Sequence, residues 1–181
     1  MPQPEPNVVL RDVVAADAAA LAHILITANN ATYRGVVPPQ CLIFTEALSA
    51  ANWSRTLTSG LSPDEFIVIA ESTTTREAVG YAWAGPCAKD AVQDAELKQI
   101  MLLPAAQRKG VGRFLLRYVA KRLSAQGLRG MRVDVLRVNP NRGFYERLGA
   151  RFVSERDFDW DGVVLSMCTY AWPDMNALLA D

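Results

Sequence analysis

The sequence is poor in the residues that build metal centres and covalent cross-links. Its 181 residues include one histidine and three cysteines, and the cysteines lie far apart, at Cys41, Cys87 and Cys168. An odd and widely spaced set fits neither a disulfide framework nor a zinc pattern, so we expect reduced thiols and no metal. Neither Cys87 nor Cys168 has a histidine nearby in sequence, which argues against a thiol nucleophile. His23 falls on the apolar stripe of a predicted helix and is expected to pack there without a catalytic role.

Net charge and long apolar runs are also missing. The 19 Lys and Arg residues balance 19 Asp and Glu residues, so no global field favours nucleic acid or an anionic membrane. No segment approaches the ~20 apolar residues that cross a bilayer, and the start of the chain does not resemble a secretory signal. We therefore expect a cytoplasmic protein with residues 1–6 as a loose tail and residues 7–181 as one domain.

Hydrophobic periodicity predicts a chain of alternating strands and helices. Strands are expected at residues 7–12, 65–70, 79–84, 95–103, 131–138, 151–156 and 163–170, and helices at residues 17–30, 45–60, 110–126 and 141–148. The order β, α, α, β, β, β, α, β, α, β, β predicts an α/β (α+β) fold, with a mixed sheet and helices on both faces.

The most informative local segment is Gln-Arg-Lys-Gly-Val-Gly at residues 107–112, which opens the most amphipathic helix. Glycines at a helix start let backbone N–H groups turn toward a phosphate. Arg108, Lys109 and Arg113 lie where positive charge opposes the helix dipole, which favours a bound anion such as a pyrophosphate. Neither GxGxxG, because Leu115 occupies its third glycine position, nor GxxxxGK[ST] is present. The simpler interpretation is a polar loop before a helix with a solvated basic face.

Three segments together resemble the GNAT superfamily of acetyl-CoA-dependent N-acetyltransferases. They are Ala-Glu-Leu-Lys-Gln-Ile-Met-Leu-Leu-Pro at residues 95–104, the segment at residues 107–112, and Val-Asn-Pro-Asn-Arg-Gly-Phe-Tyr-Glu-Arg-Leu-Gly at residues 138–149. Gln107, Gly110 and Gly112 match the family's (Q/R)xxG(x)G/A cofactor motif. The resemblance covers most of the chain.

The resemblance implies a GNAT fold, with a mostly antiparallel sheet in which two parallel strands splay apart at the acetyl-CoA site. It places the thioester between residues 101–103 and residues 135–138. A freed backbone N–H, at Leu102 or Leu103, would bind the thioester carbonyl oxygen. The cofactor-binding residues implied are Ile100, Met101, Leu102, Leu103, Gln107, Arg108, Lys109, Gly110, Val111, Gly112, Arg113, Asn139, Arg142 and Tyr145.

Tyr145 is the general acid that the resemblance implies. A departing thiolate needs a proton, and a free thiol's pKa of about 8.5 lies below a phenol's of about 10, so the transfer depends on positioning more than on acidity. The alternative is that Tyr145 is an aromatic of the core on a short helix.

Glu96 is the candidate base that would take a proton from the ammonium form of the acceptor. Strand alternation places Glu96, Lys98, Ile100 and Leu102 on one face. Lys98 would then neighbour Glu96, hold the carboxylate ionised and weaken it as a base, which favours a relay through water. A solvent-facing strand acid without a role is the alternative, and Lys98 itself is a candidate substrate contact.

Further candidates come from the loops. The resemblance implies that Asn139 contacts the pantetheine arm or orders a water nearby. The alternative is a turn residue whose side chain caps the helix after Pro140. Tyr33 and Arg34 follow the first helix, where relatives build the acceptor pocket. Arg34 could bind a carboxylate there, and the alternative is an ordinary surface arginine. The acidic residues Asp157, Asp159 and Asp161 of the closing hairpin could attract a cationic amine.

The sequence therefore predicts acetyl transfer from acetyl-CoA to a primary amine by direct attack, with a small amine favoured over a peptide. A CoA-binding sensor or interaction module without transfer activity is the alternative, and a nucleic-acid binder using the basic helix is disfavoured by the neutral charge. Apolar Phe158, Trp160 and Trp172 are predicted to be exposed, which favours a homodimer.

Overall fold

A computed structural model of the chain describes residues 6–87 and 93–179. Most of the predicted tail, residues 1–5, lies outside the described residues. The strands are β1 (Val8–Asp12), β2 (Phe66–Ser72), β3 (Ala78–Pro86), β4 (Ala95–Leu102), β5 (Met131–Leu136), β6 (Arg151–Trp160) and β7 (Val163–Trp172). The helices are α1 (Ala18–Tyr33), α2 (Glu46–Ser59), α3 (Val111–Ala125), α4 (Gly143–Arg147) and α5 (Asn176–Leu179), with short 3-10 turns η1 (Ala15–Asp17), η2 (Pro39–Leu42) and η3 (Pro104–Ala106).

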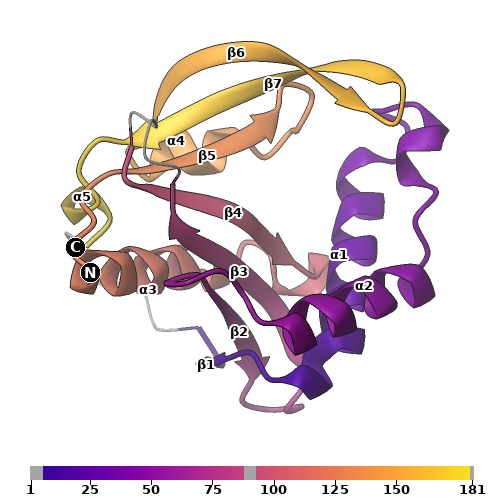
Figure 1. The fold of residues 1–181 in the computed structure, drawn as a ribbon, viewed down its shortest axis with the longest axis horizontal. Helices are drawn as coiled ribbons and strands as arrows, with labels where there is room; N and C mark the ends of the chain where they lie inside the picture. The colour runs from indigo at the N-terminus through magenta and orange to yellow at the C-terminus, as the bar shows by residue number, and fades with distance from the viewer. Residues whose placement is uncertain (1–5, 88–92, 180–181) are drawn as a thin grey trace.

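One seven-stranded sheet, in the order β1-β2-β3-β4-β5-β7-β6, organises these elements (Figure 1). All neighbouring strands are antiparallel except β4 and β5, which are parallel. The predicted mixed sheet and the predicted element order are therefore confirmed. None of the helices in the described ranges is long and apolar enough to cross a membrane.

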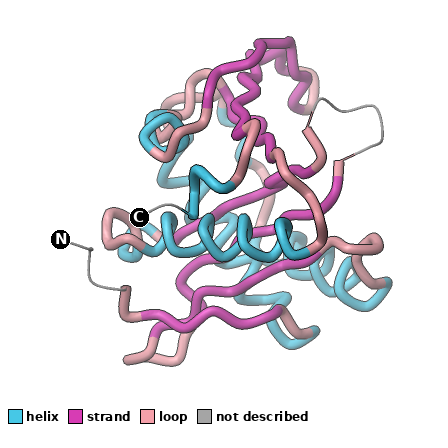
Figure 2. Tube along the Cα trace, turned by 90° about the vertical axis from the view of Figure 1, so that its left-hand side faces the viewer, coloured by secondary structure: helices cyan, strands magenta, loops and turns pink. Residues whose placement is uncertain are grey.

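Helices cover both faces of the sheet, as Figures 1 and 2 show. The apolar stripe of α3 is buried, and it packs with alternate residues of β2 such as Val68 and Ala70. The intervening Ile67 and Ile69 pack with α1 and α2 on the opposite face. Because β2 is covered on both sides, its sequence is a continuous apolar run.

Helix ends follow their sequence signals with one extension. The Thr45 hydroxyl accepts a hydrogen bond from the Leu48 N–H at 3.2 Å and caps α2. The helix α1 was predicted to end near Asn30, yet it continues to Tyr33. The prediction that His23 packs on an apolar stripe is wrong. Its side chain is 53% exposed, with Nδ1 3.0 Å from Glu46 Oε1.

The closing hairpin is longer than predicted, since β6 continues to Trp160 and β7 to Trp172. The hairpin turn itself is confirmed at Asp161 and Gly162, which both have positive φ, at 50° and 83°, as tight two-residue turns require. Apolar residues near the hairpin tip pack with Val37 and Cys41 after α1. This contact closes the end of the molecule where α1 and the hairpin meet (Figure 1).

Candidate active site

The parallel strands β4 and β5 separate after two rungs of pairing. Only Ala95 with Met131 and Glu96 with Arg132 are partners, and beyond them the strands diverge (Figure 1). A cleft of about 1060 Å³ lies between their continuations, lined by residues 98–102 of β4 and 133–136 of β5. The splay implied for this sheet is thus present, and the cleft is large enough for a cofactor.

The splay leaves backbone groups of β4 facing the cleft. Leu103 donates its N–H to the Val79 carbonyl at 2.9 Å, so Leu103 is not a free donor. In an antiparallel ladder the hydrogen-bonded and non-hydrogen-bonded pairs alternate, and Leu102 is paired with Gly80 one position earlier. The Leu102 N–H therefore points away from β3, toward the cleft between β4 and β5. Of the two donors considered in the sequence, Leu102 remains.

The loop before α3 is shaped by left-handed backbone. Arg108 and Gly110 have φ of 58° and 82°, and the Gln107 side chain anchors the loop by donating from Nε2 to the Leu102 carbonyl at 3.3 Å. Among the described residues, the backbone N–H groups of residues 108–113 have no hydrogen-bond acceptor. Unpaired N–H groups at a helix start form a site for an anion.

Gly112 lets the first turn of α3 lie close to its neighbours. A Cβ there would be 3.2 Å from Phe144 Cζ and 3.3 Å from Leu102 Cδ1. A side chain at residue 112 would therefore push α3 away from α4 and β4. The two glycines of the predicted motif thus have different roles. Gly110 adopts the left-handed backbone of the loop, and Gly112 allows α3 to approach α4 and β4 closely.

Most predicted cofactor contacts line the cleft, and four do not. Those that do are Ile100, Met101, Leu102, Gln107, Arg108, Gly110, Gly112, Arg113, Asn139 and Tyr145. Val111 is instead part of the core, and Lys109 is exposed beside the loop. Arg142 faces the sheet, where its Nη1 donates to the Tyr170 hydroxyl at 3.4 Å. Leu103 follows the end of β4 and is likewise absent from the lining.

Tyr145 combines core packing with access to the cleft. Its ring meets Phe144 edge-on at 5.2 Å and stacks on Tyr170 at 6.4 Å between ring centroids, yet it also lines the cleft. Burial raises the pKa of the Tyr145 hydroxyl, with a smaller contribution from Tyr33 nearby. Tyr145 is therefore placed both as a core aromatic and as a residue of the cleft, the two positions considered from the sequence. Its phenol is protonated at neutral pH.

Asn139 links the loop after β5 to the end of α1. Its Oδ1 accepts from the Asn141 N–H at 2.8 Å, so the side chain stabilises the turn before α4. It does not cap the helix as the alternative expected, because the N-cap of α4 is Arg142 and has no side-chain cap. Its Nδ2 donates to the Tyr33 hydroxyl at 2.9 Å, and both residues line the cleft. Burial raises the Tyr33 pKa, and the hydrogen bond from Asn139 partly offsets that rise. Tyr33 and Tyr145 thus present two protonated phenols to one cleft.

The predicted face of β4 is wrong because the strand carries a β-bulge. The pairing shifts between Trp83 and Ala84, so that Gln99 and Leu97 have consecutive partners and Lys98 has none. Ile100 consequently packs with Leu97 on the α3 side of the sheet rather than sharing a face with Glu96.

The bulge also separates Lys98 from Glu96. Lys98 Nζ pairs with Glu65 and lies 5.1 Å from the Trp83 ring centroid. Glu96 instead pairs with Arg132, whose Nη2 lies 3.3 Å from Glu96 Oε1. Lys98 lines the cleft, whereas Glu96 is set back from it. Glu96 can therefore act on a bound amine only through an intervening group such as water.

Several residues predicted near the acceptor lie elsewhere. Arg34 is exposed beyond the end of α1 and does not line the cleft. Asp157, Asp159 and Asp161 are also exposed and outside the lining, because alternation along β6 turns Asp157 and Asp159 away from the face of Phe158. Their predicted attraction for an amine inside the cleft is thus not supported by their positions.

The predicted exposed aromatics are also placed differently. Trp172 is fully buried, with its Nε1 donating to the Leu148 carbonyl at 2.8 Å. Phe158 and Trp160 are half-buried and line the cleft. The exposed apolar residues of the hairpin are instead Phe152, Val153 and Val164.

The sequence reasoning missed three charged residues of the cleft, Asp134, Arg147 and Arg156. Arg156 donates from Nη2 to Asp134 Oδ2 at 2.8 Å, and the Thr169 hydroxyl donates to Asp134 Oδ1 at 2.6 Å. The alternation of apolar and polar residues along β5 could have identified Asp134. Met131, Val133 and Val135 occupy the buried positions of the strand, which places Asp134 on the opposite face.

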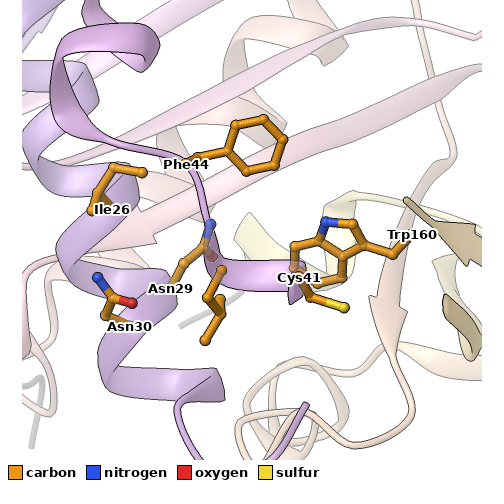
Figure 3. A pocket seen from close by; sticks show the side chains of 7 residues that line it. Ile26, Asn29, Asn30, Cys41, Phe44 and Trp160 are labelled. Atoms are coloured by element: carbon orange, nitrogen blue, oxygen red, sulfur yellow. The ribbon is translucent and has the colours of Figure 1, made fainter. Parts of the chain in front are cut away.

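A small pocket adjoins the cleft between α1 and the hairpin tip (Figure 3). It is lined by Ile26, Asn29, Asn30, Cys41, Leu42, Phe44 and Trp160, and its volume is about 20 Å³. Asn29 and Trp160 line both spaces. The pocket therefore lies against two side chains that also line the cleft, and it has room for about one small group.

A splayed parallel pair beside a helix start with unpaired N–H groups is the arrangement that the resemblance to the GNAT superfamily implies for an acetyl-CoA site. Residues 63–149 match the family model "Acetyltransferase (GNAT) domain". The uncharacterised N-acetyltransferase YuaI of Bacillus subtilis (strain 168) is 28% identical over 172 residues, which cover 94% of this chain and 96% of that protein. Residues 63–149 therefore carry a GNAT acetyltransferase domain.

Solved structures agree on the fold. The ribosomal-protein-alanine N-acetyltransferase of Brucella melitensis superposes with a TM-score of 0.70 at 18% identity, covering 91% of this chain and 98% of that one. A GNAT superfamily phosphinothricin acetyltransferase of Sinorhizobium meliloti, solved in complex with AcCoA, gives a TM-score of 0.65 at 23% identity, covering 93% and 89%.

Proposed function

We propose that this GNAT N-acetyltransferase transfers the acetyl group of acetyl-CoA directly to a primary amine of a small molecule. The observation that carries the proposal is the coincidence of unpaired N–H groups at residues 108–113 with the splay between β4 and β5. The first feature suits a diphosphate, and the second suits the extended arm that follows it. The AcCoA complex of the Sinorhizobium relative supports the same co-substrate.

The residues that would hold acetyl-CoA fit its chemistry. The loop N–H groups and the side chains of Arg108 and Arg113 offer donors and positive charge to the diphosphate. Along β4, backbone groups that β5 has released can pair with the amides of the pantetheine arm. Bound there, acetyl-CoA supplies the acetyl thioester.

Two groups of the chain would act on the reacting atoms. As the amine nitrogen bonds to the acetyl carbon, the Leu102 N–H donates to the carbonyl oxygen and stabilises its negative charge. As the carbon–sulfur bond breaks, the Tyr145 hydroxyl donates its proton to the departing sulfur and regains one from solvent. Burial raises the Tyr145 pKa, so the phenol stays protonated, but the transfer to sulfur is uphill and must rely on close positioning.

The proton that the amine loses needs a separate route. We assign it to Glu96 acting through water, since Glu96 is set back from the cleft and paired with Arg132. A covalent acyl-cysteine route is disfavoured at Cys87, because burial raises the pKa of its thiol and so lowers the thiolate fraction.

The remaining expectations from the sequence complete the proposal. Residues 7–181 would act as one domain in the cytoplasm, where the free thiols of Cys41, Cys87 and Cys168 stay reduced. A homodimer would bury exposed Phe152 and Val153 on the edge strand β6. Light scattering measures the mass of the purified protein in solution, and a monomeric mass at all concentrations would contradict the homodimer.

The test is product formation by the purified protein. A panel of primary amines is incubated with acetyl-CoA, and products are identified by mass spectrometry while free CoA is followed by a thiol reagent. Acetylated amine in proportion to released CoA is expected. CoA binding by calorimetry without any acetylated product would favour the alternative, a CoA-binding module without transfer activity.

A further inference from the structure

We propose that the acceptor is an apolar α-amino acid or a close analogue, with a carboxylate beside its primary amine. The inference rests on the proposed acetyl transfer and names its substrate class. The relatives' names mention a ribosomal protein and phosphinothricin, so the class must be inferred from the cleft of this chain.

The charges that line the cleft disfavour a polycationic acceptor. Its lining includes five basic side chains and one acidic side chain, namely Lys98, Arg108, Arg113, Arg147, Arg156 and Asp134. Arg108 and Arg113 belong to the cofactor loop, and Arg147 lies on α4. The other two basic side chains are already paired, Lys98 with Glu65 and Arg156 with Asp134. A polyamine or an aminoglycoside-like compound would find a single carboxylate in this lining, already paired with Arg156, and no acidic cluster to bind its several charges.

The acceptor end nevertheless contains one carboxylate, directly beside a guanidinium. Arg156 Nη2 and Asp134 Oδ2 are 2.8 Å apart, so groups that complement them must also be adjacent. An α-amino acid has this arrangement, because one carbon separates its amine from its carboxylate. The ammonium group of the arriving acceptor would face Asp134, and its carboxylate would face Arg156.

Arg156 has donors available for that carboxylate. Its side chain is 54% exposed, and its Nε and Nη1 form no hydrogen bond to the described part of the chain. A guanidinium edge of this kind binds a carboxylate through two parallel hydrogen bonds. Lys98 lies two residues beyond the last β4–β5 rung, as Asp134 does on the opposite strand, but its charge is paired with Glu65. Arg156 is therefore the donor that we assign to the carboxylate.

The opposite end of the acceptor space is apolar. Phe158 and Trp160 share a face of β6 with Arg156, and Tyr33 meets the Trp160 ring edge-on at 6.1 Å. The small pocket of Figure 3 adjoins this end, because Trp160 lines it together with Ile26 and Phe44. With a volume of about 20 Å³, it accommodates the tip of an aliphatic side chain. The cleft therefore complements a charged head and an apolar tail.

Matched acceptors test this inference. Leucine is compared with 3-methylbutylamine, which lacks only the carboxylate, with leucinamide and with spermidine. We expect kcat/KM for leucine to exceed that for the bare amine by about 10- to 100-fold, the range of a charge-assisted hydrogen bond. In Arg156→Gln this preference should fall to near unity, whereas the control Arg151→Gln, exposed on the same strand and outside the cleft, should keep it.

The outcomes separate the two proposals. Equal or better acetylation of the bare amine, of leucinamide or of spermidine would overturn the amino-acid class and leave the transferase proposal standing. A leucine preference that survives Arg156→Gln would also overturn the assignment. Failure to acetylate any of the four amines, with CoA binding intact, would overturn the proposed function itself.

Discussion

Gly110 offers the sharpest perturbation of the cofactor loop, because the chain contains a matched control. Gly110 and Gly127 flank the helix α3 with φ of 82° and 84°, and no atom lies within 4 Å of a Cβ built on either. Only Gly110 lines the cleft. Gly110→Ala and Gly127→Ala therefore impose the same backbone strain, one inside the site and one outside it.

The expected stability cost is the same for both variants. A left-handed conformation costs an L-residue roughly 1–2 kcal/mol, which for a chain of this size lowers Tm by about 2–8 °C. At Gly110 the strained loop would also misalign the unpaired N–H groups of residues 108–113. Loss of one hydrogen bond to a charged phosphate, worth about 1.5–3 kcal/mol, weakens CoA binding by about 10- to 100-fold.

Thermal melts and calorimetric titration with CoA measure the two effects separately. We expect similar melting temperatures for the two variants, a weaker Kd for CoA only in Gly110→Ala, and a matching rise in KM for acetyl-CoA. Equal CoA affinity in both variants, with equal loss of stability, would refute the assignment of the loop to the diphosphate.

Three further predictions concern proton transfer and stability. Tyr145→Phe should lower kcat by about 10²- to 10⁴-fold with little change in CoA affinity, and full turnover by this variant would exclude Tyr145 as the general acid. Because burial raises the Tyr145 pKa, wild-type activity should not fall between pH 8 and about pH 10 through ionisation of this phenol. Glu96→Gln should lower kcat by about 100-fold at pH 7. A pH–rate profile of this variant that is unchanged from wild type would contradict the assignment of Glu96 as a base acting through water. Asp17 accepts two hydrogen bonds from Arg11 at 2.8 Å, which hold the Asp17 pKa below its ordinary value. The ionised carboxylate therefore stabilises the fold above about pH 4, and this contribution is lost as the pH falls through the folded-state pKa. Asp17→Asn should therefore lower the unfolding free energy by about 1.5–3 kcal/mol at pH 7, and a difference from wild type that persists undiminished at pH 3 in denaturant titrations would contradict this.

The regular elements could be predicted because their signals are local. Continuous apolar residues at positions 66–70 indicate a strand covered on both faces, and the apolar stripe of residues 111–123 indicates a helix. Gly110 and Gly127 mark the ends of that helix through their own backbone preference. Asp161 and Gly162 likewise specify a tight hairpin turn.

The faces of β4 could not be predicted, because the bulge at Lys98 depends on tertiary contacts. Simple alternation places Glu96 and Lys98 together, whereas Lys98 contacts Glu65, directly before β2, and the Trp83 ring of β3. Glu96 then pairs with Arg132 across the only parallel rungs of the sheet. The acceptor end was missed for the same reason, since its paired charges come from β5 and from a hairpin that folds back over α1.

The central claim is that the start of α3 binds the diphosphate of CoA and directs the thioester between β4 and β5, toward Tyr145. A crystal structure of the protein with CoA tests it most directly. The account predicts phosphate oxygens within hydrogen-bond distance of the N–H groups of residues 108–113 and the CoA sulfur beside the Tyr145 hydroxyl. CoA bound elsewhere, or a sulfur far from Tyr145 with the loop N–H groups unpaired, would contradict it.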